Sequence, residues 1–309
     1  MTGETRRILV IKLGALGDFV LATGPFAAIR RAHPDGRIVL LTTAPYAGLA
    51  AESGLFDEIW IDERPRWFDL PAIRRLRAKL RGGRFDRVYD LQTSDRSGWY
   101  FRLFPRRSRP EWSGIAAGCS HPHANPARNS LHTIERQAEQ LAMAGIPETP
   151  PPDLAWAAAD ISRFGLPARF AMMVPGGAAH RPAKRWPEAH YADIGRLFAA
   201  AGIAPVVAGG PDEAALAGRI AAACGGISLA GRTSFADLAA LARAAEAAVG
   251  NDTGPMHIAA TAGCRSVVLF SAESDPALTA PRGAKVRLLR AADLADLPVS
   301  EVAAALSLG

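Results

Sequence analysis

The chain has 309 residues, 49% of them hydrophobic and 21% charged, which is typical of a globular protein of about two domains and excludes a disordered or collagen-like chain. Three scattered cysteines (119, 224 and 264) exclude a disulfide framework and a zinc ribbon and suit a reducing, cytoplasmic compartment; neither a signal peptide nor a membrane-spanning run is expected. The 36 basic residues, 32 of them arginine, exceed 30 acidic ones and give a net charge of +6, which predicts an anionic partner.

The first half of the chain predicts buried strands that alternate with helices, the pattern of a parallel sheet with crossover helices. The predicted strands cover residues 8–13, 37–43, 58–62 and 87–91, and the predicted helices cover residues 19–32 and 132–145. Residues 105–129 are rich in glycine, proline, serine, histidine and arginine, which predicts one long loop.

A short turn with two glycines, Gly14 and Gly17, joins the first strand to Asp18 and the first helix. Aspartate at the start of a helix most often caps the free backbone N–H groups. The positive end of the helix dipole would also keep the carboxylate ionised, as a general base must be before it accepts a proton. The residues alone leave open whether Asp18 is a cap or a base.

The excess of positive charge is confined to the first half of the chain. Residues 1–150 carry 22 basic and 16 acidic side chains, whereas residues 151–309 carry 14 of each. Within the first half, the basic stretch from Arg64 to Arg109 has 14 basic and four acidic residues. This stretch predicts nucleic acid, an anionic membrane surface or an acidic glycolipid as partner, and the lack of a recognition-helix or RNP pattern argues against nucleic acid.

Residues 146–153 include three consecutive prolines and predict an extended linker between two domains, residues 1–150 and 151–309. The second domain repeats the alternation of strands and helices. Its predicted strands cover residues 170–174, 204–208, 227–230, 247–250 and 266–271, and its predicted helices cover residues 188–201, 213–223, 235–244 and 255–262. We therefore expect two α/β domains, each with a parallel sheet.

Glycine-rich turns follow most of the predicted strands of the second domain. They lie at residues 175–177, 209–211, 231–233 and 250–255. The carboxyl ends of parallel strands meet at one edge of a sheet, where ligands bind, and glycines such as Gly176 and Gly177 let the backbone approach a ligand. We expect a phosphate-bearing ligand at this edge.

Three polar residues near these turns have both a structural and a functional interpretation. Lys184 is either a solvated loop residue or a point charge for a diphosphate. Asp252 is a candidate cap for the helix near Pro255, and His257 is either a structural histidine of that helix or a ligand-binding one. The motifs GxGxxG, GxxxxGK[ST], HExxH, GxSxG and Asp-x-Asp are absent, so neither a dinucleotide site nor a metal site is predicted.

Six segments, in this order along the chain, resemble those of a known family. They are ILVIKLGALGD (8–18), YDLQ (89–92), HTIER (132–136), PGG to AKRWP (175–187), AGGPDE (208–213) and GNDTGPMHIAA (250–260). Over essentially its whole length the chain resembles glycosyltransferase family 9, the lipopolysaccharide heptosyltransferases. The resemblance implies the GT-B fold, in which two Rossmann-like parallel-sheet domains face each other across a cleft, the N-terminal one for the acceptor and the C-terminal one for a nucleotide-diphosphate sugar.

For the first domain, the resemblance makes Asp18 the base that deprotonates the acceptor hydroxyl, in a single displacement that inverts the anomeric centre. Gly14, Gly17 and the basic stretch would lie on the acceptor side. Family members with known heptose specificity usually carry a Ser-Ser or Thr-Ser pair where this chain has Gly14-Ala15. This departure leaves the donor sugar and the acceptor open.

For the second domain, the resemblance implies a set of residues that hold the donor diphosphate, namely Lys184, His257 and the backbone of Thr253 and Gly254. Asp252 would orient this loop or contact the sugar, and Glu213 would bind the ribose hydroxyls. The resemblance also implies an enzyme without metal or cofactor that works at the inner face of the cytoplasmic membrane. ADP-heptose is the first candidate donor, and a lipopolysaccharide core or a related anionic glycolipid is the candidate acceptor.

Two other functions stay open. A nucleotide-sugar epimerase or hydrolase would use the same fold, but it would leave the basic first half without a role. A non-catalytic binding protein on a degenerate GT-B fold is disfavoured because Asp18, Lys184 and the DTGPMH run occur together. The sequence indicates no particular oligomeric state.

Overall fold

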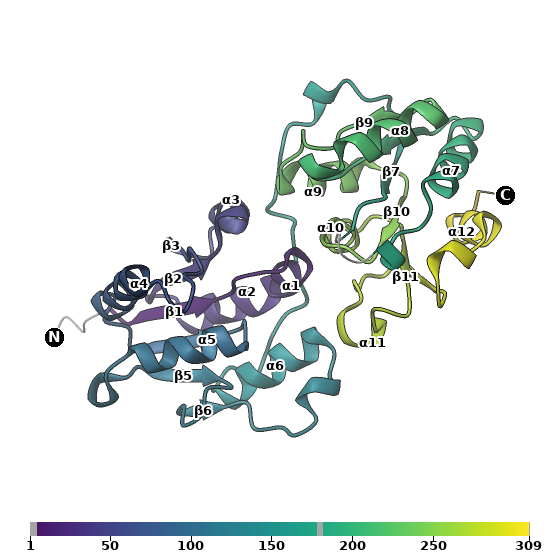
Figure 1. Cartoon of the computed structure of the whole chain (residues 1–309). Coiled ribbons are helices and arrows are strands. Elements are labelled where there is room, and N and C mark those ends of the chain that lie inside the picture. Colours follow the sequence, from purple (N-terminus) through teal and green to yellow (C-terminus); the bar gives the residue numbers. More distant parts are fainter. Residues whose placement is uncertain (1–4, 178–181, 309) are drawn as a thin grey trace. The chain divides into compact units, whose positions relative to one another are not determined.

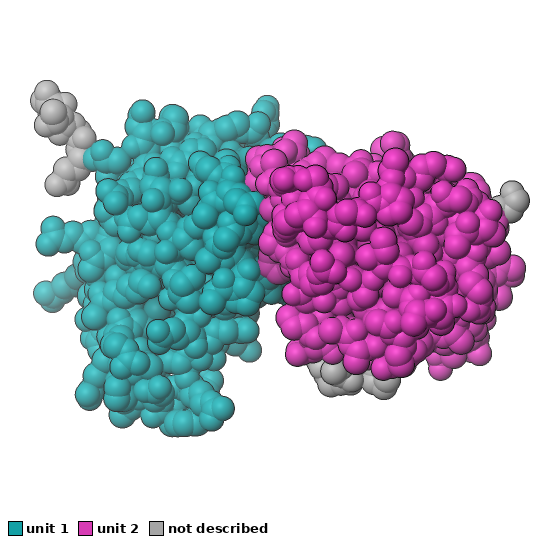
Figure 2. Space-filling model, turned by 90° about the horizontal axis from the view of Figure 1, so that it is seen from above, with its two compact units in different colours: residues 1–152 teal, residues 153–309 magenta. Residues whose placement is uncertain are grey.

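The computed structural model describes residues 5–177 and 182–308, and the chain separates into two compact units (Figures 1 and 2). The N-terminal unit comprises residues 1–152 and the C-terminal unit residues 153–309. The division falls inside the proline-rich segment 146–153. Each unit has its own hydrophobic core.

The N-terminal unit is built on a parallel sheet of six strands in the order β3-β2-β1-β4-β5-β6. The strands are β1 (Arg7–Ile11), β2 (Arg37–Thr42), β3 (Glu58–Ile61), β4 (Arg87–Asp90), β5 (Glu111–Gly114) and β6 (His121–Pro122). The helices are α1 (Leu16–Leu21), α2 (Thr23–Ala32), α3 (Ala44–Glu52), α4 (Leu70–Gly82), α5 (Asp95–Tyr100) and α6 (Thr133–Met143). The residues of β1 from Ile8 to Ile11 are fully buried, which explains the uninterrupted apolar run because helices cover both faces of a parallel sheet.

Two predictions for this unit are wrong. The helix expected over 19–32 is divided into α1 and α2 at Ala22, because Pro25 has no N–H to donate to the carbonyl of Leu21 and cannot continue the first helix. The long loop expected over 105–129 contains β5 and β6, which extend the sheet beyond β4. Trp112 anchors β5, since its side chain is fully buried and packs edge-to-face against Phe101.

The C-terminal unit has a second parallel sheet of six strands, in the order β12-β11-β10-β7-β8-β9. The strands are β7 (Phe170–Val174), β8 (Ala204–Val207), β9 (Ile227–Ser228), β10 (Ala248–Asn251), β11 (Ser266–Phe270) and β12 (Val286–Arg290). The helices are α7 (Glu188–Ala200), α8 (Ala214–Cys224), α9 (Phe235–Ala244), α10 (Gly254–Thr261), α11 (Pro276–Thr279) and α12 (Val299–Leu306). The predicted strands and helices of this half are confirmed, although β9 is shorter than expected and β12, α11 and α12 were not predicted.

In both sheets the turns singled out in the sequence lie at the carboxyl edge. Asp18 follows β1, and the turns at 175–177, 209–211 and 250–255 follow β7, β8 and β10. Among the described residues, no helix has both the length and the apolar character needed to cross a bilayer.

Candidate functional site

Asp18 lies in the first turn of α1, at the carboxyl edge of the N-terminal sheet. The helix begins at Leu16 and its N-cap residue is Ala15, whose side chain makes no cap hydrogen bond, so the interpretation of Asp18 as the cap is wrong. Asp18 is half-buried. Within the described residues no hydrogen bond or ion pair engages its carboxylate, which leaves both oxygens available to accept a proton from a ligand.

The loop between β1 and α1 is fixed by the segment after β4. Leu13 donates its backbone N–H to Oε1 of Gln92 over 2.8 Å, and Lys12 donates from Nζ to the carbonyl of Leu91 over 3.3 Å. The Gln92 backbone N–H in turn donates to Oδ1 of Asp90. The YDLQ segment thus supports the loop that leads into α1 and Asp18, a role that the sequence alone did not indicate.

Gly14 is required in this loop by space and by backbone conformation. Its φ is +131°, and a Cβ atom there would lie 2.9 Å from Cε2 of Tyr46. The ring of the half-buried Tyr46 stacks on that of the buried Phe19, which restricts its movement. A side chain at this position would displace the loop that precedes Asp18.

Two buried charged groups lie beneath Asp18. Burial lowers the pKa of Lys12, while the charges of Asp18 and Asp90 raise it. Burial also raises the pKa of Asp90 to about 6, against the lowering effect of the backbone N–H groups of Thr93 and Gln92. Lys12 is therefore a buried cation that interacts with two carboxylates, one of which is the candidate base.

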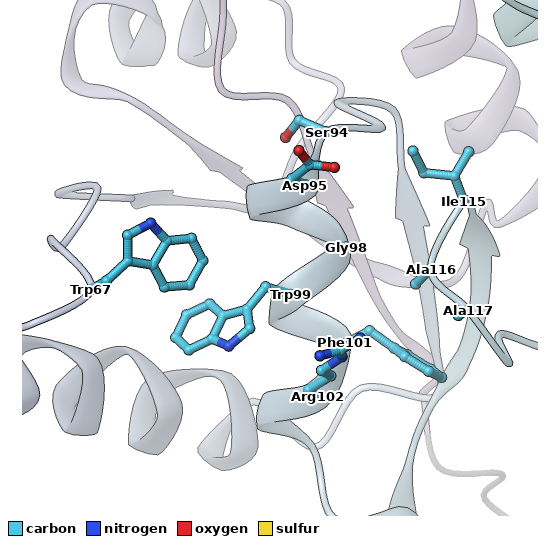
Figure 3. A pocket seen from close by; sticks show the side chains of 10 residues that line it. All are labelled: Trp67, Ser94, Asp95, Gly98, Trp99, Phe101, Arg102, Ile115, Ala116 and Ala117. Carbon is cyan, nitrogen blue, oxygen red and sulfur yellow. The ribbon is translucent and has the colours of Figure 1, made fainter.

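A pocket opens at the same edge of the N-terminal sheet (Figure 3). Its volume is about 350 Å³, and it lies between the loop after β3, helix α5 and the segment after β5. The rings of Trp67 and Trp99 pack edge-to-face on one side of it, with their centroids 4.8 Å apart. Arg102, Asp95 and Ser94 add charged and polar groups to the lining.

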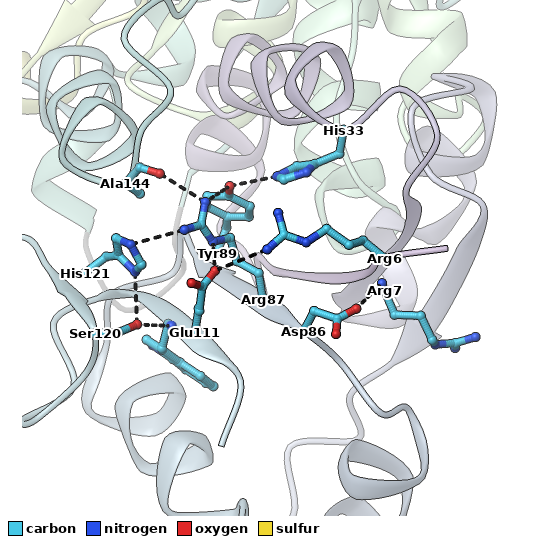
Figure 4. A network of polar contacts seen from close by, with 11 residues as sticks. Arg6, Arg7, His33, Asp86, Arg87, Tyr89, Glu111, Ser120, His121 and Ala144 are labelled. Carbon is cyan, nitrogen blue, oxygen red and sulfur yellow. Dashed lines mark hydrogen bonds and ion pairs between the residues drawn. The ribbon is translucent and has the colours of Figure 1, made fainter. Parts of the chain in front are cut away.

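The basic stretch Arg64–Arg109 does not lie on one side of the sheet. Arg87 begins β4 at the amino edge, opposite Asp18, where it pairs with Glu111 at 2.8 Å and donates to the hydroxyl of Tyr89 (Figure 4). The Nε2 atom of His33 lies 2.8 Å from the same hydroxyl oxygen and forms a hydrogen bond with it. Arg87 therefore ties strands together at the edge away from the candidate base and lies outside the acceptor side.

In the C-terminal unit, Lys184 and Asp252 form a half-buried ion pair. The distance from Lys184 Nζ to Asp252 Oδ2 is 3.3 Å, and their side chains are 16% and 13% exposed. The Ser274 hydroxyl donates to the same Oδ2 over 2.8 Å. Lys184 is thus not a solvated loop residue, and Asp252 does not cap α10, whose N-cap residue is Thr253.

Asn251 joins two turns of this unit and was not singled out in the sequence. Its side-chain amide donates to the carbonyls of Pro175 and Gly176 over 2.9 and 3.0 Å. Its Oδ1 accepts from the Trp186 backbone N–H and the Tyr191 hydroxyl, each over 3.0 Å. The fully buried side chain therefore fixes the 175–177 turn and the segment of Lys184 against β10.

Glu213 joins a further pair of turns. Its Oε1 accepts the backbone N–H of Gly177 over 2.9 Å, and its Oε2 accepts that of Gly210 over 2.8 Å. A Cβ atom on Gly176 would lie 1.8 Å from Oε1 of Glu213, so the glycine makes room for this carboxylate. The Gly177 N–H is thereby already engaged within the protein.

The start of α10 completes the candidate donor site. Gly254 is its first residue, and His257, in its first turn, is 5% exposed. The structure thus gathers Lys184, Asp252, Thr253 and Gly254 around one turn. Residues 178–181 of the PGG–AKRWP segment lie outside the described residues, and the described residues contain no cluster of three or more potential metal ligands.

Comparisons with known proteins agree with these features. The sequence model of glycosyltransferase family 9 (heptosyltransferase) matches residues 73–303. Lipopolysaccharide heptosyltransferase 2 of Escherichia coli is 27% identical over 92% of this chain and 88% of its own length, and that of Salmonella typhimurium is 26% identical over the same shares.

Solved structures share the two-sheet fold of this chain. The E. coli ADP-heptose lipopolysaccharide heptosyltransferase II structure has a TM-score of 0.79 and 24% identity, and covers 97% of each chain. The E. coli heptosyltransferase WaaC with ADP has a TM-score of 0.76 and 21% identity, and covers 97% of this chain and 99% of its own. The expected GT-B fold, with two Rossmann-like parallel-sheet domains, is confirmed. On the match of its family model over most of the sequence, the chain belongs to glycosyltransferase family 9 (heptosyltransferase) and is a glycosyltransferase.

Proposed function

We propose that this glycosyltransferase moves a heptose from ADP-heptose to a lipopolysaccharide core or a related anionic glycan, with inversion and without a metal ion. The names of its relatives support the donor and the acceptor, since they are lipopolysaccharide heptosyltransferases, and a neighbouring structure is a heptosyltransferase with ADP-2-deoxy-2-fluoro heptose. The observation that carries the proposal is the half-buried Asp18 carboxylate, which no described residue engages, on a loop fixed by Gln92 and Lys12.

The reaction is a single displacement in which Asp18 is the base. Its carboxylate takes the proton of the acceptor hydroxyl while that oxygen forms a bond to the anomeric carbon of the sugar. The bond from the anomeric carbon to the diphosphate oxygen breaks on the opposite face, and the nucleoside diphosphate leaves with the electron pair. Backside attack inverts the anomeric configuration.

The C-terminal unit supplies the groups that stabilise the leaving diphosphate. Lys184 carries a positive charge that Asp252 and Ser274 already orient, so little reorganisation is needed when negative charge develops. The backbone N–H groups at the start of α10, around Thr253 and Gly254, add the positive end of a helix dipole. His257 is the further candidate ligand of the diphosphate.

Glu213 is both a structural and a ligand-binding candidate in this proposal. Each of its oxygens already accepts one backbone N–H, from Gly177 and from Gly210. A carboxylate oxygen has more than one lone pair, so it can accept a ribose hydroxyl in addition. The turns that surround the ribose are then set by the same carboxylate that binds it.

The acceptor is assigned to the N-terminal unit. The pocket of about 350 Å³ with Trp67, Trp99 and Arg102 lies at the edge that carries Asp18 and combines aromatic surfaces with a cation, as an anionic sugar requires. Gly14 lies in the loop that precedes α1, and Gly17 is next to the base in the first turn of α1. Since the relatives are named for lipopolysaccharide, we place the enzyme in the cytoplasm, peripherally on the inner face of the cytoplasmic membrane.

The variant Asp18→Asn tests the base. We expect transfer of heptose from ADP-heptose to a lipopolysaccharide core acceptor, followed by mass spectrometry, to fall by about 10²–10⁴-fold, while calorimetry shows unchanged binding of ADP. Asp35→Asn, an exposed aspartate in the turn before β2, is the matched control and should keep full activity. Undiminished turnover of Asp18→Asn would exclude Asp18 as the base, and release of free sugar without acceptor would favour a hydrolase.

A further inference from the structure

One segment of the N-terminal unit exposes an unusual number of large apolar side chains. Of eight large hydrophobic residues exposed among the described residues, three lie within four positions at the junction of the loop after β3 and the first residue of α4: Trp67 at 56% exposure, Phe68 at 76% and Leu70 at 57%. We call these three residues the apolar tip. Clustered exposed apolar side chains on a surface that faces water mark an interaction site.

The backbone of the segment holds Phe68 and Leu70 outward, whereas the ring of Trp67 packs on Trp99 and lines the pocket (Figure 3). Asp69 lies between Phe68 and Leu70, and its Oδ1 accepts the N–H of Ala72 as the N-cap of α4. The Asp69 N–H donates to the carbonyl of Arg66 over 2.9 Å. The polar residue of the segment is thus used inside the turn, while its apolar neighbours face solvent.

The apolar tip is surrounded by exposed arginines. Arg64 and Arg66 precede it, and Arg74, Arg75 and Arg77 follow it on α4; all five side chains are exposed. None of the five forms an ion pair in the parts of the chain that the structure describes. The same segment contains two exposed carboxylates, Glu63 and Asp69, so the five arginines exceed them and the surface carries a net positive charge.

We propose that the apolar tip and these five arginines dock the N-terminal unit onto an anionic lipid bilayer. Tryptophan, phenylalanine and leucine enter the boundary between headgroups and acyl chains, while arginines bind lipid phosphates and lay their aliphatic stems on the apolar region. Each arginine adds attraction to a negatively charged leaflet. An acidic protein partner would satisfy the arginines but would leave the exposed side chains of Phe68 and Leu70 without an apolar environment.

The apolar tip is on the reacting edge of its sheet. It follows β3, and Asp18 follows the parallel strand β1, so both lie at the carboxyl edge. Docking by this surface brings lipid headgroups to the side of the unit that carries the candidate base. In this respect the inference rests on the proposed function, whose acceptor is lipid-linked; the bilayer contact itself is tested without any transfer reaction.

The test is co-sedimentation of the full chain with vesicles. We expect binding to vesicles of phosphatidylglycerol and phosphatidylcholine in equal parts, and little binding to phosphatidylcholine alone. Phe68→Ser/Leu70→Ser should weaken binding by about tenfold or more, because both side chains lose their apolar contact with lipid. Arg74→Gln/Arg77→Gln should weaken it at low salt and by a smaller factor at high salt, where charge is screened.

Leu288→Ser and Arg290→Gln, exposed positions on β12 of the C-terminal unit, are the matched controls and should bind as the wild type does. The proposal is overturned if the wild type ignores anionic vesicles, as it would if an acidic protein were the partner, or if Phe68→Ser/Leu70→Ser binds them unchanged. A chain that binds vesicles but transfers no heptose would contradict the proposed function alone.

Discussion

Asp90 shows how burial sets the properties of single residues near the candidate base. It ends β4 with a fully buried side chain, and its Oδ1 accepts the backbone N–H groups of Gln92 and Thr93. Its Oδ2 has no hydrogen-bond partner among the described residues. A buried carboxylate with one unpaired oxygen is costly to ionise, which is why its pKa rises to about 6.

This raised pKa predicts a pH dependence of stability. Because the pKa of Asp90 is about 6 in the folded protein and ordinarily 3.8, the folded state binds the proton more tightly between about pH 4 and pH 6. The contribution of Asp90 to the free energy of unfolding therefore falls as the pH rises through this window, by up to about 3 kcal/mol. Asp90→Asn cannot ionise and should lack this fall.

Urea unfolding of the wild type and Asp90→Asn, at about pH 4.5 and about pH 7.5, measures the difference. We expect the stability of the variant relative to the wild type to improve at the higher pH. The asparagine Oδ1 can accept the same two N–H groups, so the comparison isolates the charge. If the free energies of unfolding of the two proteins differed by the same amount at both pH values, the raised pKa of Asp90 would be contradicted.

At the residue scale, the sequence indicated the sheet edge at which the candidate side chains lie, but not their partners. Asp18 and Lys184 follow strands as expected, and both lie at carboxyl edges. The engagement of Gly177 by Glu213 joins residues 36 positions apart, and that of Gly176 by Asn251 joins residues 75 positions apart. Contacts at such separations depend on how strands are ordered in the sheet, which residue types alone do not specify.

At the scale of elements, Gly24 shows how closely α2 approaches the start of the linker. A Cβ atom on Gly24 would lie 2.1 Å from the carbonyl oxygen of Pro150. We expect Gly24→Ala to lower the free energy of unfolding by about 1–3 kcal/mol, because backbone must shift on both sides. Thermal or urea unfolding of the variant and the wild type measures this difference in the free energy of unfolding.

Gly48→Ala is the matched control, since Gly48 also lies within a helix, α3, but a Cβ atom added there would have no neighbouring atom within 4 Å. At this position alanine should be neutral or stabilise by up to about 1 kcal/mol through its better helix propensity. If both variants were equally stable, the close packing of α2 against Pro150 would be disproved.

Strands that are buried at every position are marked along their whole length by an apolar run. The strand β7 reads FAMMV and is buried at every position, so its apolar run marked its whole length. By contrast, β5 and β6 read EWSG and HP and have only one large apolar side chain, Trp112. Their strand conformation comes from hydrogen bonds between β5 and β4 and between β5 and β6, and no local sequence pattern predicts it.

At the scale of the whole molecule, each unit has a core made of its own residues. The buried cluster of the C-terminal unit extends from Ala171 to Leu306, and that of the N-terminal unit from Leu9 to Cys119. If ADP binds the C-terminal unit as proposed, its binding energy should stabilise that unit directly.

Hydrogen exchange checks this prediction. With ADP at about 100 times its Kd, the C-terminal unit gains about 2.7 kcal/mol, which slows exchange of its most protected amides about a hundredfold. We expect this slowing in β7 and β10 and none in β1 and β4. Equal slowing in both units, or slowing confined to the N-terminal unit, would refute the assignment of the donor to residues 153–309.

The charge of the molecule follows the same division. The excess of positive charge that the sequence located in the first half comes from arginines that the structure puts to different uses. Arg87 joins strands at the amino edge, whereas Arg74 and Arg77 are exposed on α4. Net charge therefore does not indicate which surface of the unit is positive, because pairing with residues such as Glu111 depends on the fold.

The contact between Gly176 and Glu213 also restricts how this protein can change over evolutionary time. An alanine at position 176 would occupy the volume of the Glu213 carboxylate, so it is permitted only after position 213 has changed to a smaller side chain. A larger residue at position 176 should therefore occur among descendants of this chain only together with a replacement of Glu213. A directed-evolution library that randomises position 176 alone would sample mostly dead ends, whereas one that randomises both positions would reopen the turns after β7 and β8 to new conformations.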